Sequence, residues 1–263
     1  MDITFTCSSQ WIADAFTELR LSCDVPLRRD ITCPLPVVTA LLLHDSFDHS
    51  EVFERNLERH ERLHAQGMLE LALGRAFSAC TLGQLSMALE TITCMRPVQR
   101  MQGIGIVTQN SYSRRFRAPP AVEAMRASVR LFNARRRHAE RSGIERALAT
   151  YLVLLSIHPF ADGNGRTARM LFAADVLAHD GHAAPRLMLG LILLHRGRGR
   201  LFHLAAMCAR TGDFSMLATC YGEALSLADT FLPALCPQHG RLAVLEEYRK
   251  IDALLKRTPE PHV

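Results

Sequence analysis

Apolar residues recur at helical spacing along most of the chain, and strand-like alternation is nearly absent. In the clearest segment they fall at intervals of one, three and four residues, at Ile144, Leu148, Tyr151, Leu152 and Leu155. This spacing gives a helix a continuous apolar face. Since Val153 and Leu154 are apolar as well, we expect this helix to be buried on most sides, at the centre of a mainly helical fold.

The same spacing predicts further helices on both sides of this central one. One begins behind Pro119 and Pro120, with the residues of its apolar face at Val122, Met125, Val129 and Phe132. The others are expected at about 50–75, 81–92, 166–180 (closed by Gly181), 185–197, 200–210, 214–228 (behind Asp213 as N-cap) and 240–257.

Two segments depart from the helical pattern. Residues 1–35 are expected to be irregular, because Pro26, Pro34 and Pro36 interrupt any helix. Residues 103–120 combine β-forming and turn-forming residues, which favours a short hairpin closed near Asn110 and Ser111.

Composition and charge narrow the class of protein. The 263 residues are 48% hydrophobic, typical of a globular protein with a sizeable core. The net charge of +5 suits an acidic partner or a polyphosphate but is too small for a dedicated nucleic-acid binder, and no apolar run is long enough to span a bilayer. We therefore expect no nucleic-acid or membrane partner.

Eight cysteines without a CxxC pair indicate reduced thiols, and the first residues show no secretory signal. These features favour a cytoplasmic location. A signal for secretion into a host cell would be invisible to this reasoning, so an effector remains an alternative.

The chemistry-bearing residues concentrate directly after the central helix, in "HPFADGNGRTAR" (158–169). A glycine-flanked turn that opens a helix presents unpaired N–H groups to an anion. Two arginines three residues apart, Arg166 and Arg169, suit a di- or triphosphate, and Asp162 before the turn suits Mg²⁺. His158 can accept a proton near neutral pH. Together these groups favour phosphoryl or nucleotidyl transfer.

This segment resembles the signature of the Fic family, HPFx[D/E]GN[G/K]RxxR, at every specified position. The broader likeness covers roughly residues 80 to 230 and implies an all-α Fic-type core with a short β-hairpin flap and an N-terminal extension. It divides the chain into an extension at 1–79, a catalytic core at 80–232 and a C-terminal helix at 233–263.

The resemblance implies transfer of AMP from ATP to a Ser, Thr or Tyr hydroxyl of a target protein, with release of pyrophosphate. By this likeness His158 is the general base, Asp162 holds Mg²⁺ on the phosphates, and Phe160 packs inward. The nucleotide-binding residues would be Gly163, Asn164, Gly165, Arg166 and Arg169.

The hairpin resembles the family's flap, which binds the target by strand addition, so Ile104, Ile106, Thr108 and Arg114 are its expected contact residues. Arg114, Arg115 and Arg117 there could favour an acidic target or simply form a solvated edge.

The donor is not fixed by the motif. The phosphorylating Doc branch carries Lys at the position of Gly165 and Ala at that of Gly163, so this sequence favours nucleotidyl transfer. UMP and phosphocholine transfer occur on the same fold, which leaves UTP and CDP-choline as alternative donors.

Two alternative functions, a zinc protease and a binding module without catalysis, stay open. The segment "HERLH" (60–64) fits the HExxH zinc-protease pattern, although Arg62 and its charged neighbours favour a solvated helix. A Fic fold without catalysis would act as a binding module.

Many Fic proteins carry an inhibitory helix, [S/T]xxxE[G/N]. Three segments come near it, at 50–54, 86–90 and 219–223, and each lacks the final residue. The first makes Glu54 a candidate inhibitor that pairs with Arg169, with an ordinary surface helix as the alternative. A separate antitoxin-like chain could otherwise provide the restraint.

Overall fold

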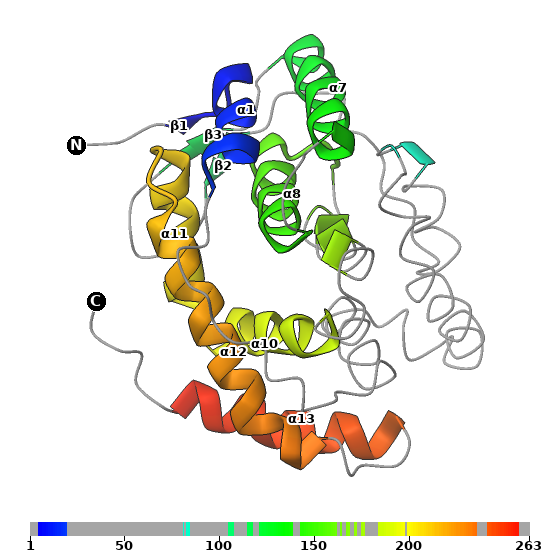
Figure 1. Cartoon of the computed structure of the whole chain (residues 1–263), viewed down its shortest axis with the longest axis vertical. Coiled ribbons are helices and arrows are strands. Elements are labelled where there is room, and N and C mark those ends of the chain that lie inside the picture. The colour runs from blue at the N-terminus through cyan, green and yellow to red at the C-terminus, as the bar shows by residue number, and fades with distance from the viewer. Residues whose placement is uncertain are drawn as a thin grey trace.

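The computed structural model describes residues 5–19, 81, 83–84, 105–107, 115–117, 121–138, 143–161, 164, 167–168, 171–172, 175–176, 184–197, 199–235 and 241–257. Most of these residues are helical, which confirms the predicted all-α class (Figure 1). The elements are β1 (Phe5–Thr6), α1 (Ser9–Glu18), β2 (Gly105–Val107), β3 (Arg115–Arg117), α7 (Val122–His138), α8 (Gly143–Ile157), α10 (Ala184–Gly197), α11 (Gly199–Arg210), α12 (Ser215–Leu235) and α13 (Arg241–Arg257).

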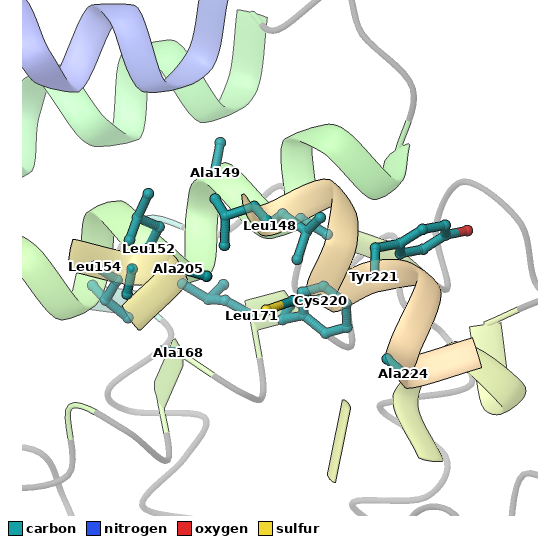
Figure 2. Close-up of a cluster of buried hydrophobic side chains, with 14 of the residues drawn as sticks. Leu148, Ala149, Leu152, Leu154, Ala168, Leu171, Ala205, Cys220, Tyr221 and Ala224 are labelled. Carbon is teal, nitrogen blue, oxygen red and sulfur yellow. The ribbon is translucent and has the colours of Figure 1, made fainter. Parts of the chain in front are cut away.

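The central helix is α8, as predicted. Its residues 147–150 are all buried, as are Leu152, Val153, Leu154 and Ile157. Figure 2 shows Leu148, Leu152 and Leu154 of α8 beside side chains of α11 and α12, including Ala205 and Cys220. A helix buried on several sides has its position set by its neighbours, so the residue at its end is held firmly.

The expectation that residues 1–35 are irregular is wrong for the part that the structure describes. Ser8 caps α1 by accepting a hydrogen bond from the Trp11 N–H (3.1 Å), and α1 buries one face with Trp11, Ile12, Ala15 and Phe16. The helix packs against α7 and α8, with the rings of Phe16 and Phe132 6.1 Å apart. The prolines that suggested irregularity all lie beyond its end.

The predicted hairpin is confirmed in its pairing and belongs to a larger sheet. Strands β2 and β3 pair antiparallel, with Ile106 opposite Phe116, and β1 adds parallel to the other side of β3. The strand order is β1-β3-β2. The predicted turn near 110–111 lies outside the described residues. In the described sheet, β1 and β2 are the edge strands.

The C-terminal helices pack on one another. α10 packs against α12, and α13 packs against both of them (Figure 1). Asp213 accepts a hydrogen bond from the Ser215 N–H (3.0 Å), so it caps α12 as predicted. The helix ends seven residues later than expected, because it continues through Pro233 to Leu235.

Other predicted elements are described only in part. Thr81 and Gln84 form a reciprocal capping box at the start of the helix expected at 81–92. The helix expected at 50–75 and the cap at Gly181 lie outside the described residues. None of the helices in the described part of the chain combines the length and apolar character needed to cross a membrane.

Candidate functional site

His158 stands at the exact point where α8 ends. Its N–H donates to the Leu154 carbonyl (2.9 Å) and its φ is 50°, so it takes the left-handed conformation of an αL helix cap. Pro159 follows and cannot continue the helix. The cap turns the chain sharply and leaves the imidazole half-buried at the helix terminus.

This cap position usually holds glycine, because a Cβ makes the left-handed conformation unfavourable by about 1–2 kcal/mol. A histidine kept in this strained conformation marks a candidate functional residue, since strain of this kind collects at active sites. His158 therefore stands out by its geometry as well as by its chemistry.

Phe160 and Asn164 close the loop after His158. The Phe160 side chain is fully buried, as the family resemblance implied. The Asn164 Oδ1 accepts from the Phe160 N–H (3.0 Å), and its Nδ2 donates to the Phe160 carbonyl (2.8 Å). One side chain thus satisfies both main-chain groups of a buried residue. This pairing ties the main chain of Phe160 to the side chain of Asn164.

The segment after this loop enters the core as a helix. Its described residues are helical and buried at spacings of one and three, at Thr167, Ala168, Leu171, Phe172, Asp175 and Val176. We call the described helical residues of this segment, 164, 167–168, 171–172 and 175–176, the motif helix. Its buried residues lie in the core beside α8, and they are helical as predicted for 166–180 wherever the structure describes that range.

Arg210 supports the last turn of α8, and sequence reasoning missed it. Its Nε donates to the Ser156 Oγ (3.1 Å), two residues before His158. Burial lowers the pKa of the Arg210 guanidinium to about 10, although the nearby Cys7 and Tyr151 favour its charged form. Arg210 is the last residue of α11, where arginine usually serves as a surface residue, so no local signal distinguished it.

The described part of the site comprises His158, Phe160 and Asn164. Ile106 of the predicted flap lies in β2, opposite Phe116 of β3. The remaining predicted residues lie outside the described residues: Glu54, Ile104, Thr108, Arg114, Asp162, Gly163, Gly165, Arg166 and Arg169.

The described residues contain no group of three or more His, Cys, Asp or Glu side chains that could hold a metal ion. Asp162 and the histidines of 60–64 are not among the residues searched. The predicted magnesium ligand and the zinc-protease alternative both stay predictions.

Residues 88–174 match the family model described as Fic/DOC family. The matched segment contains β2, β3, α7, α8 and the motif at 158–169, and it supports a Fic domain there. The search among curated proteins gave no match to the chain. The helices α1, α10, α11, α12 and α13 lie outside the matched segment. Of these, α1 packs against α7 and α8, and α11 and α12 place Ala205 and Cys220 beside α8 (Figure 2).

Proposed function

We propose that this protein is an adenylyltransferase that moves AMP from ATP to a Ser, Thr or Tyr hydroxyl of a target protein. One observation carries the proposal: the complete HPFADGNGRxxR motif lies inside the Fic/DOC-matched segment, and its histidine caps the central helix. The matched family supports a transferase, and Gly163 and Gly165 of the motif favour nucleotidyl transfer over phosphorylation.

In the proposed reaction, His158 takes the proton of the target hydroxyl as its oxygen attacks the α-phosphorus. A bond forms between that oxygen and the α-phosphorus, and the bond between the α-phosphorus and the bridging oxygen to the β-phosphorus breaks. Pyrophosphate leaves with the electron pair of that bond. The left-handed cap places the main chain of His158 at the end of the buried helix α8, which limits where its imidazole can meet the hydroxyl.

The phosphates would be held by the turn and the start of the motif helix. Since the Asn164 amide is engaged with Phe160, we assign to Asn164 a contribution through its main chain and through the loop that it shapes. The first N–H groups of a helix have no intrahelical partner and suit phosphate oxygens. Arg166 and Arg169 would bind the outer phosphates through their guanidinium groups.

Asp162 would hold Mg²⁺, which would neutralise charge on the phosphates and orient them. Asp162→Ala should therefore lower activity, and raised Mg²⁺ should restore part of it. Activity that is indifferent both to EDTA and to this substitution would rule out the metal.

The donor can be tested with differently labelled nucleotides and a cell lysate as the source of targets. Label from [α-³²P]ATP but not from [γ-³²P]ATP identifies AMP transfer, whereas γ-label alone identifies phosphorylation. If targets take up label only from UTP or only from CDP-choline, that compound is the donor and ATP is not. A binding module without catalysis would transfer no label from any of these donors.

The base can be tested with a matched pair of histidine variants. His158→Ala should lower transfer by about 10²- to 10⁴-fold and leave ATP binding largely intact, because the base acts on the hydroxyl. His138→Ala, at the exposed end of α7, should leave the rate unchanged. Wild-type activity in His158→Ala would show that the base is wrongly assigned.

The proposed partner is the target protein, which would dock along the flap. Activity would be inhibited either by Glu54 of this chain or by a separate inhibitory chain. Glu54→Gly should raise self-labelling, and it should have no effect in an Arg169→Ala background if Glu54 acts by pairing with that arginine. Unchanged activity in Glu54→Gly would mean that a separate chain inhibits this protein, or that it is not inhibited. We propose a cytoplasmic site of action, in this cell or in a host.

A further inference from the structure

A buried polar network joins α7, α8 and the motif helix. Arg136 of α7 donates to Asp175 of the motif helix twice, from Nε to Oδ2 (3.1 Å) and from NH2 to Oδ1 (2.8 Å). Thr150 of α8 donates from its Oγ1 to the same Asp175 Oδ2 (2.8 Å). The side chains of Arg136 and Asp175 are each 1% exposed, and Thr150 is fully buried.

Stability alone does not account for such a network. Moving two charges out of water costs several kcal/mol per ion, and well-packed apolar residues often do as well or better. The inward face of the motif helix is otherwise largely apolar, with Leu171, Phe172 and Val176 around Asp175. To this apolar packing the two-bond fork adds directional contacts, which are satisfied at only one rotation and one height of the motif helix.

The network connects the two elements that bear the reacting groups. Thr150 lies on the helix that ends at His158, eight residues before it and thus about 12 Å along the axis. Asp175 lies in the motif helix, nine residues after Arg166 and six after Arg169 in the sequence. A change in the rotation of the motif helix would shift its start relative to the histidine.

We propose that Asp175 is a positioning residue, held by Arg136 and Thr150, that sets the orientation of the motif helix and so places the phosphate-binding end of that helix relative to His158. This inference rests on the proposed function, because it gives the orientation a use in nucleotide binding. Asp175 itself touches no substrate in this scheme.

A second arginine–aspartate pair provides a control: the Arg186 side chain is buried (4% exposed) and the Asp229 side chain is 32% exposed. Arg186 of α10 binds Asp229 of α12 through Nε and NH2, the same fork between two helices. Neither helix carries a residue of the motif. Asp229→Asn therefore weakens a fork of the same chemistry without touching the proposed positioning network.

The test compares the full-length variants Thr150→Val, Thr150→Ser, Arg136→Lys and Asp229→Asn. Valine keeps the shape of Thr150 and removes the hydroxyl, serine restores the hydroxyl, and lysine keeps the charge of Arg136 without its fork. For each variant we would measure Tm, the Kd for ATP well below that Tm, kcat, and hydrogen exchange of the peptide covering 164–176.

We expect Thr150→Val and Arg136→Lys to weaken ATP binding about tenfold or more and to speed exchange in 164–176. Thr150→Ser should restore both values, and Asp229→Asn should lower Tm with an unchanged Kd and unchanged exchange in 164–176. The proposal is overturned if Thr150→Val changes Tm alone, or if it changes the Kd no more than Asp229→Asn does. If Arg136→Lys does not fold, the Thr150 pair decides.

The exchange measurement separates this inference from the proposed function. A wild-type chain that neither binds nor uses ATP refutes the adenylyltransferase proposal, while faster exchange in Thr150→Val still supports the orienting role of the network. Unchanged exchange in Thr150→Val, in a chain that does transfer AMP, refutes the network and leaves the function standing.

Discussion

Gly190 of α10 lies against the main chain of Ala224 of α12: a Cβ added to Gly190 would stand 2.0 Å from the Ala224 carbonyl oxygen and 2.6 Å from its carbon. The two helices can approach this closely only because position 190 has no side chain. Both residues are fully or almost fully buried, so the contact belongs to the core that packs beside the central helix.

Gly190→Ala should therefore destabilise the protein by about 1–3 kcal/mol, since the obstacle is backbone and the helices must move apart. Gly222→Ala, in α12 and with nothing within 4 Å of its added Cβ, should stabilise by about 0.5–1 kcal/mol through helix propensity. Urea unfolding of both variants checks this. Equal stability of the two would contradict the close approach.

Because His158 has a left-handed conformation, we expect that the residue needed for activity lowers the folding stability at this position. Both His158→Gly and His158→Ala should lose transfer, but the glycine variant should be more stable than the alanine variant by about 1 kcal/mol, because only glycine adopts φ 50° without strain. Thermal unfolding of the pair measures the difference. An alanine variant as stable as the glycine variant would mean that this cap is unstrained.

Because the Nδ2 of Asn164 donates to the Phe160 carbonyl, we expect this NH₂ group to be essential to folding of the loop. Asn164→Asp replaces the Nδ2 donor by an oxygen that faces the Phe160 carbonyl, and it should cost about 1–3 kcal/mol of folding stability. Asn164→Ala leaves both Phe160 groups without this partner and should cost a similar amount. Tm and ATP affinity measured together should fall in both variants. An aspartate variant with wild-type values would show that the amide is dispensable.

Because two thiols are buried, we expect the folding stability of the protein to fall at alkaline pH. Burial raises the pKa of Cys7 to about 12, with Arg210 offsetting part of the rise, and burial followed by Glu223 raises the pKa of Cys220 to about 12. In the unfolded chain these thiols ionise near the ordinary value of 9.0, so above that pH the unfolded state binds fewer protons and folding stability falls.

The double variant Cys7→Ala, Cys220→Ala should lose less stability than the wild type between about pH 9 and 10 in urea unfolding. Arg210 has a lowered pKa near 10 and opposes the trend at higher pH, which is why the comparison stops there. Parallel pH profiles for the two proteins would contradict the assigned burial of the thiols.

The sequence by itself determined the features that depend on local order. Apolar spacing placed α7, α8, α10, α11, α12 and α13 within a few residues, apart from the longer end of α12, because a helix needs only its own face and its termini to be recognised. The pairing of β2 with β3 followed from turn and β-forming residues close together. The position of His158 at the end of a buried helix followed from a proline after an apolar run.

The tertiary structure alone decided what depends on contacts between distant residues. α1 looked irregular in sequence, yet Trp11 donates from its indole to the Ala209 carbonyl (2.9 Å), a partner 198 residues away. Asp175 stands among apolar residues in the sequence, and only the structure shows that Arg136, 39 residues before it, binds it. Burial of a polar group requires a partner, and no local pattern states which distant residue supplies it.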